Sequence, residues 1–226
     1  MKNLNSISIY LLIILSGFSS FSQINSERLM INYYETLYEI DLRSKDLVGS
    51  AYISKEFLPA RLNEDKVIYS MNYNAFQDQM VVKKDGNPFF LRKDYDFTVA
   101  FLNTDKTYRV FDYQEGGQKM TGFFVVLFQG EKISLLLKEK IKYYSEKEAK
   151  SGYDKYQPPK LKREKDKFFL GYKNNSTKEL PKKKKDILIL FTSKATDIES
   201  YVKRNNLGFK NKEDLTKIFT YYHTLK

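Results

Sequence analysis

The chain has 226 residues, with 39 lysines and arginines against 28 aspartates and glutamates, and a formal net charge of +11 at neutral pH. It has no cysteine and one histidine, which excludes disulfides, thiolate metal sites and cysteine nucleophiles, and leaves His223 as the one imidazole base. Hydrophobic residues make up 42% of the chain and aromatic residues 15%, enough for a packed core.

Residues 1–22 have the pattern of a secretory signal peptide. Lys2 supplies positive charge, residues 7–15 form an apolar run, and Ser20 and Ser22 have the spacing of a cleavage site before Gln23. That run is about half of the roughly 20 residues needed to cross a bilayer, and no later segment is apolar enough to span one. We expect an exported protein that is periplasmic, outer-membrane-associated or extracellular, with residues 23–226 as its single domain. Export without cysteines suggests bacterial secretion.

Residues 67–144 predict a series of short strands. Residues 79–84 and 89–93 are β-rich, and Asp85-Gly86 between them predicts a hairpin with a type I′ turn, which needs positive φ angles. Residues 122–129 are apolar at successive positions and predict a central strand covered on both faces. At least six strands about ten residues apart favour an antiparallel meander that forms a sandwich or partial barrel. Residues 27–62 fit a helix or a strand.

The pattern becomes helical over about residues 194–226. Thr196 and Glu199 have the spacing of a capping box, and Asn211 precedes an apolar stripe at helical spacing. We expect two C-terminal helices packed on the open face of the sheet, which makes the fold mainly β with C-terminal helices (α+β). Residues 182–191 fit a short helix or a strand.

Positive charge is concentrated in one part of the chain. Residues 138–185 hold 17 basic and 7 acidic residues, whereas residues 23–137 hold 14 and 16. We expect a basic excursion at about 145–186 with one strand embedded in it at 168–173. The candidate anion-binding residues are Lys160, Lys162, Arg163, Lys165, Lys167, Lys182, Lys183, Lys184 and Lys185.

Two interpretations of this basic stretch remain open. Clustered lysines attract polyanions through long-range fields and counterion release, which would make anionic envelope glycans or lipopolysaccharide the partners rather than nucleic acid. Lysines are equally common in solubilising loops and along sheet edges, where they prevent strand pairing with other molecules.

No catalytic motif is recognisable, and we expect no catalytic residue, metal or cofactor. His223 lies beside the C-terminal apolar stripe, where a surface or half-buried helix position is expected. Asp94 and Asp96 would share one face of a strand and could serve a glycosidase, although surface strands often carry such pairs. The sequence favours a non-enzymatic protein that acts by binding or scaffolding. The alternatives are a polyanion or membrane-surface binder that uses residues 138–185, and a carboxylate-based hydrolase.

Three parts of the chain resemble a known group of proteins. They are the Phe21-Ser22-Gln23 signal end, the segment Gly49–Ile53 followed by Tyr73-Asn74-Ala75-Phe76, and the closing Tyr201-Val202-Lys203, Glu213-Asp214-Leu215 and Tyr221-Tyr222. Together they resemble small exported proteins of Bacteroidota-type bacteria without an assigned activity. The resemblance implies an envelope location and a β-rich body, and it supplies no catalytic residues.

Overall fold

The computed structural model describes residues 30–32, 46–149 and 154–225, so the expected signal peptide lies outside the described residues. The strands are β1 (Met30–Asn32), β2 (Leu58–Leu62), β3 (Ile68–Asn74), β4 (Gln79–Lys84), β5 (Asn87–Leu91), β6 (Thr98–Phe101), β7 (Thr107–Glu115), β8 (Gln118–Phe128), β9 (Ile133–Lys138), β10 (Ile141–Tyr144), β11 (Lys160–Arg163), β12 (Lys167–Tyr172) and β13 (Thr177–Glu179). The helices are α2 (Lys184–Ile189), the short η2 (Thr192–Lys194), α3 (Ala195–Arg204) and α4 (Lys212–Thr224).

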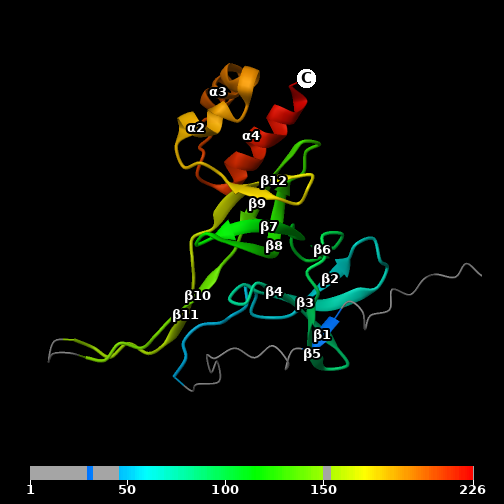
Figure 1. The fold of residues 1–226 in the computed structure, drawn as a ribbon, viewed down its shortest axis with the longest axis vertical. Helices are drawn as coiled ribbons and strands as arrows, with labels where there is room; N and C mark the ends of the chain where they lie inside the picture. Colours follow the sequence, from blue (N-terminus) through cyan, green and yellow to red (C-terminus); the bar gives the residue numbers. More distant parts are fainter. Residues whose placement is uncertain (1–29, 33–45, 150–153, 226) are drawn as a thin grey trace, which may run out of the picture.

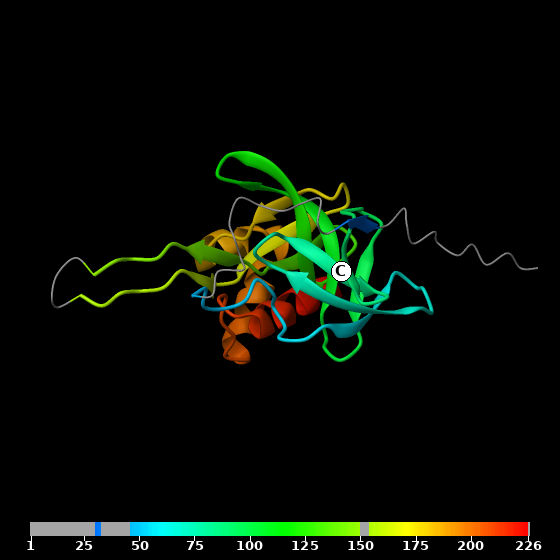
Figure 2. The same cartoon turned by 90° about the horizontal axis from the view of Figure 1, so that it is seen from below.

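One curled antiparallel sheet forms the body of the protein, and the helices stand at one end of it (Figure 1). The order of its strands is β1-β5-β4-β3-β2-β6-β7-β8-β9-β12-β13. Most neighbours in the sheet are also neighbours in the chain, which confirms the predicted antiparallel meander with C-terminal helices. Strands β10 and β11 pair with each other in a separate ribbon that projects from the side of the body (Figures 1 and 2).

Two tight turns set the registers of the sheet. Asp85 and Gly86 have φ angles of 51° and 81°, which confirms the predicted hairpin between β4 and β5. Gly116 and Gly117 also have positive φ angles, and they join Glu115 directly to Gln118 in the next strand. The strand expected at residue 122 therefore begins at Gln118, because the two glycines form a hairpin turn instead of a longer break.

Strand β8 is covered on both faces, as predicted. Phe123 and Val125 belong to a core on one side of the sheet, and Phe124 belongs to a smaller aromatic cluster on the other side. Helix α4 packs on β8 and β9, and its Phe219 contacts Phe128 with ring centroids 6.4 Å apart. The helical end, which consists of α2, η2, α3 and α4, thus continues the hydrophobic interior of the sheet and encloses a third hydrophobic cluster.

The C-terminal segment forms helices, but one predicted cap is wrong. Helix α3 begins at Ala195 with Lys194 at its N-cap, so Thr196 lies inside the helix and forms no capping box. Asn211 does cap α4, because its side-chain oxygen accepts a hydrogen bond from the backbone N–H of Asp214 at 2.8 Å. Residues 182–191 contain the helix α2. No helix within the described ranges combines the length and apolar character of a membrane span.

We expect Asn211→Ala to lower the free energy of unfolding by about 1 kcal/mol, because the amide of Asp214 loses its acceptor. Urea denaturation monitored by circular dichroism measures this change. Thr216→Ala removes a hydroxyl further along α4 that donates to the carbonyl of Lys212, and it should have the smaller effect. Equal losses in the two variants would contradict the capping role.

Only part of the basic stretch projects from the body. Strand β12, which corresponds to the predicted strand at 168–173, lies inside the main sheet between β9 and β13. The projecting part is the ribbon of β10 and β11. Lys147 and Gln157 continue its pairing beyond these two strands. The stretch expected as a single excursion is therefore divided between the sheet, the ribbon and the start of the helical end.

Candidate functional site

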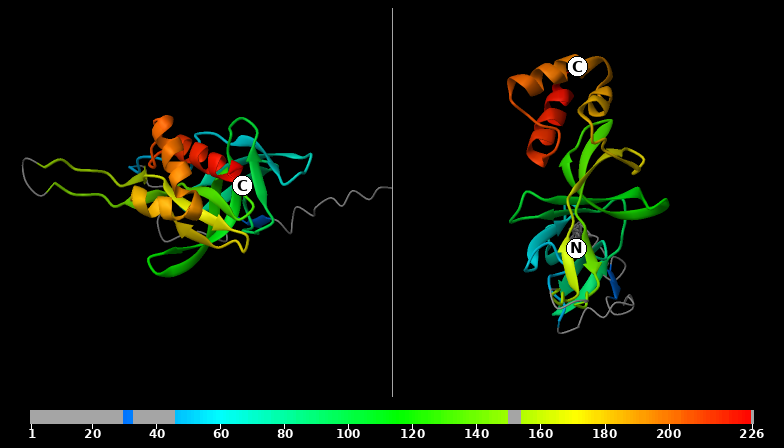
Figure 3. Two further views of the ribbon diagram at one scale, coloured as in Figure 1. Left: turned by 90° about the horizontal axis from the view of Figure 1, so that it is seen from above. Right: turned by 90° about the vertical axis from the view of Figure 1, so that its left-hand side faces the viewer.

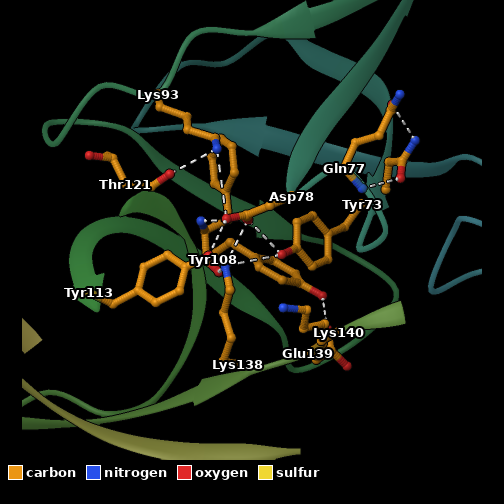
Figure 4. Close-up of polar contacts among 12 residues, drawn as sticks. Tyr73, Gln77, Asp78, Lys93, Tyr108, Tyr113, Thr121, Lys138, Glu139 and Lys140 are labelled. Atoms are coloured by element: carbon orange, nitrogen blue, oxygen red, sulfur yellow. Dashed lines mark hydrogen bonds and ion pairs between the residues drawn. The ribbon is translucent and has the colours of Figure 1, made fainter. Parts of the chain in front are cut away.

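Two buried ionic networks meet where β9 passes into β10. Lys138 ends β9 and Glu139 follows it, and their side chains are 7% and 1% exposed. Neighbouring residues of extended chain point to opposite sides. Lys138 accordingly reaches Asp78, whereas Glu139 reaches Tyr108 on β7 (Figure 4).

The first network is centred on Asp78. Its Oδ1 accepts hydrogen bonds from the hydroxyl of Tyr73 at 2.8 Å and the backbone N–H of Phe123 at 3.0 Å, and lies 2.8 Å from Nζ of Lys138. Its Oδ2 accepts from Tyr113 at 3.4 Å. Nζ of Lys93 lies 3.7 Å from the same oxygen and donates to the carbonyl of Thr121 (Figure 4).

The backbone explains how a turn residue reaches the middle of the sheet. Asp78 has a φ of 55° in the turn between β3 and β4, a left-handed conformation that aspartate tolerates better than most residues. Its carboxylate crosses β8 at Gly122. A Cβ at residue 122 would lie 2.0 Å from Oδ2 of Asp78 and 2.6 Å from Nζ of Lys138, so the ion pair occupies the space that a side chain would fill.

The second network is centred on Glu139. Its Oε1 accepts hydrogen bonds from Lys106 at 2.7 Å and Arg163 at 2.8 Å, and its Oε2 accepts from the hydroxyl of Tyr108. Arg163 also contacts Asp166 at 2.8 Å. This network fixes the base of the ribbon, because Arg163 is the last residue of β11.

Burial shifts the pKa of several of these groups. Burial lowers the pKa of Lys138, and Asp78 only partly opposes this. Burial and the neighbouring carboxylates raise the pKa of Tyr73 and Tyr108 well above the ordinary value. For Glu139, burial alone would raise the pKa, but Lys106, Tyr108 and Arg163 outweigh it and the pKa is lowered.

The amine of Lys138 is fully engaged. Its acceptors are the carboxylate of Asp78, the carbonyl of Phe123 at 2.9 Å and the hydroxyl of Tyr73 at 3.4 Å, which match the three hydrogens of an ammonium group. The amine also lies over the rings of Tyr113 and Phe124, at 4.8 and 4.7 Å from their centroids. This arrangement orients the strands and leaves no lone pair of the amine for attack on a substrate.

Beside the Asp78 network lies a groove of about 200 Å³, which we call the lysine groove. Tyr113 and Phe169 supply aromatic lining, and the β7–β8 turn forms one wall. Its charged lining consists of Lys138, Lys140, Lys142, Lys165, Lys167, Glu115, Glu164 and Glu179. Asp78 compensates the charge of Lys138, so the other four lysines face three glutamates and leave one positive charge in excess.

The cations of the lysine groove differ in how firmly they are paired. Lys142 lies 3.5 Å from Glu164, and Lys167 lies 3.5 Å from Glu179; both lysine side chains are more than half exposed. Lys140 pairs with Glu115. Lys165 has no hydrogen bond or ion pair with any part of the chain that the structure describes.

The structure separates the predicted anion-binding residues into two groups. Lys160, Lys162, Lys165 and Lys167 lie on the ribbon or in the lysine groove, and Arg163 is held by Glu139. The remaining residues, Lys182–Lys185, lie at the helical end (Figure 1). The sequence did not single out Lys138, Lys140 and Lys142, although their spacing of two residues along extended chain is the signal that could have found them.

The other polar candidates are not brought together. Asp94 and Asp96 lie in a turn rather than on a strand, and the backbone N–H of Asp96 donates to Oδ1 of Asp94 at 3.0 Å, so their expected common strand face is wrong. His223 is exposed on α4, with its ring centroid 5.6 Å from that of Phe128. Across residues 30–32, 46–149 and 154–225, no group of three or more acidic or histidine side chains is placed to hold a metal ion.

Comparison with known proteins found no match to a family model, a curated protein or a solved structure.

Proposed function

We propose that the protein is an exported, non-enzymatic binding protein of the bacterial envelope, and that it holds a polyanion in the lysine groove and along the base of the ribbon. Export rests on the signal-peptide pattern of residues 1–22. The observation that carries the binding role is the lysine groove, in which segments distant in the chain present four lysines besides the buried Lys138 around one small opening.

The pairing of these lysines favours an exchangeable ligand. Exposed ion pairs contribute about 0–1 kcal/mol each, because water screens them and ordering the side chains costs entropy. The pairs at 3.5 Å, Lys142–Glu164 and Lys167–Glu179, therefore present little obstacle to an incoming anion. Unpaired Lys165 offers a first contact.

The ribbon extends this positive surface. Lys142 lies directly opposite Lys162 in the pairing of β10 with β11, and like charges at such positions destabilise a strand pair. An anionic group between them would relieve the repulsion. A groove of about 200 Å³ holds one sulfate, carboxylate or phosphate group of a longer chain, so acidic glycans and lipopolysaccharide head groups are the ligands that this surface suits.

The test measures binding to a sulfated polysaccharide at two salt concentrations. Wild-type protein should bind at low salt and lose affinity steeply at moderate salt, because binding releases counterions. Lys162→Gln/Lys165→Gln/Lys167→Gln should lower the low-salt affinity at least tenfold. The matched control Lys182→Gln/Lys183→Gln/Lys185→Gln removes the same charge from the helical end and should retain most of the affinity. Equal losses in both variants, or binding that salt does not weaken, would overturn the proposal.

A further inference from the structure

The helical end carries an apolar surface that the sheet does not cover. Ile189, the last residue of α2, is 63% exposed, the highest value for a large hydrophobic side chain within the described residues. It lines an open groove of about 600 Å³ together with Leu188 and Ala195. Ile187, two residues earlier, is fully buried, so α2 directs one isoleucine into the core and another toward solvent.

Lysines surround this apolar surface. Lys184 and Lys185 line the groove, and Lys182 and Lys183 immediately precede α2. Lys184 pairs with Glu199 at 2.7 Å, whereas the side-chain amines of Lys182, Lys183 and Lys185 have no partner within the described residues. The acidic groups nearby are Asp186, which is exposed, and Glu199. Four lysines against two carboxylates leave the rim positive.

We propose that this surface docks the protein on an anionic phospholipid membrane. Ile189 and Leu188 enter the boundary between headgroups and acyl chains, while Lys182, Lys183 and Lys185 contact lipid phosphates. Lysines beside an exposed apolar surface match the chemistry of such a boundary. The groove offers apolar and cationic side chains with few hydrogen-bond acceptors, which suits lipid better than the main chain of a peptide.

The shape of the molecule allows this contact. The helices form one end of its long axis, while the ribbon projects sideways from the middle (Figures 1 and 3). Docking by the helical end would therefore leave the projecting ribbon outside the membrane contact. The membrane contact uses different residues from the proposed polysaccharide site.

The absence of tryptophan from the chain provides a direct test. Ile189→Trp introduces a single tryptophan into the full chain at the proposed contact. Ile68→Trp is the matched control, because Ile68 is 55% exposed but lies on β3 in the sheet, away from α2. The probe is a vesicle of phosphatidylglycerol and phosphatidylcholine, with brominated acyl chains as quencher. Any lipid binding by residues 7–15 is common to both variants, so the readout is specific to the labelled position.

We expect vesicles to shift the tryptophan fluorescence of the Ile189→Trp variant to the blue and to quench it, and to leave that of the Ile68→Trp variant unchanged. Adding Lys182→Gln, Lys183→Gln and Lys185→Gln to Ile189→Trp should abolish most of the quenching, since each lysine contributes about fivefold to affinity for an anionic surface. Equal quenching in both variants, quenching that the lysine changes leave intact, or a response to an acidic amphipathic peptide but not to vesicles would overturn the inference. Polysaccharide binding by the same variants reports on the lysine groove separately.

Discussion

Asp78→Ala should lower the free energy of unfolding by about 3–5 kcal/mol, because it leaves the buried ammonium of Lys138 without its counter-charge. The backbone N–H of Phe123 and the hydroxyl of Tyr73 lose their acceptor in the same variant. Urea denaturation at pH 7 measures the loss. Asp94→Ala is the matched control, since that carboxylate is exposed in a turn, and it should cost much less.

A double variant distinguishes a buried charge from a general loss of packing. Lys138→Met keeps a long side chain against the rings of Tyr113 and Phe124 while removing the charge. Asp78→Ala/Lys138→Met should be more stable than Asp78→Ala alone, because no unpaired ammonium remains buried. If the losses in free energy of unfolding of the two single variants simply add in the double variant, Asp78 does not stabilise the fold through its ion pair with Lys138.

Turns and helix ends were predictable where local chemistry specifies them. Asp85-Gly86 needs positive φ angles whatever surrounds it, and Asn211 caps a helix with its own side chain, so both were correctly identified. The sequence predicts the start of β8 only at residue 122, because the polar residues 118–121 give no strand pattern by themselves. They extend β8 because β7 pairs with them along the whole hairpin.

The candidate site was predictable only as a region. The excess of lysine at 138–185 indicated which part of the chain carries positive charge, but it could not separate Lys165, which is unpaired within the described residues, from Arg163, which is held by buried Glu139. That distinction depends on contacts between residues more than 20 positions apart. Asp78 is an ordinary turn residue in the sequence, and its role depends on Gly122 passing beside its carboxylate.

Glu139→Gln should lower the free energy of unfolding by about 2–3 kcal/mol at pH 7, and the difference from wild type should shrink in acid. The carboxylate accepts three charge-assisted hydrogen bonds at a side chain that is 1% exposed. Glutamine keeps the size of the side chain and removes the charge. Lys106 and Arg163 are partly exposed and can be hydrated, so the loss is smaller than for Asp78→Ala.

The direction of the acid effect follows from the lowered pKa of Glu139. Burial opposes ionisation there, but Lys106, Tyr108 and Arg163 outweigh it, so the folded state releases the proton more readily than the unfolded state, where the pKa is about 4.3. The stabilisation is complete above that unfolded value and is lost as pH falls through the folded pKa. Protonated glutamic acid resembles glutamine, so wild type and variant should converge in acid.

Urea denaturation at a series of pH values from 7 to 3 measures this convergence. Glu164→Gln is the matched control, because Glu164 also faces a lysine and a tyrosine but lies on the exposed ribbon, where salt screens its pairing. Its difference from wild type should be small at every pH in moderate salt. A difference between wild type and Glu139→Gln that stays constant from pH 7 to pH 3 would mean that packing around residue 139, rather than its charge, holds the base of the ribbon to the sheet.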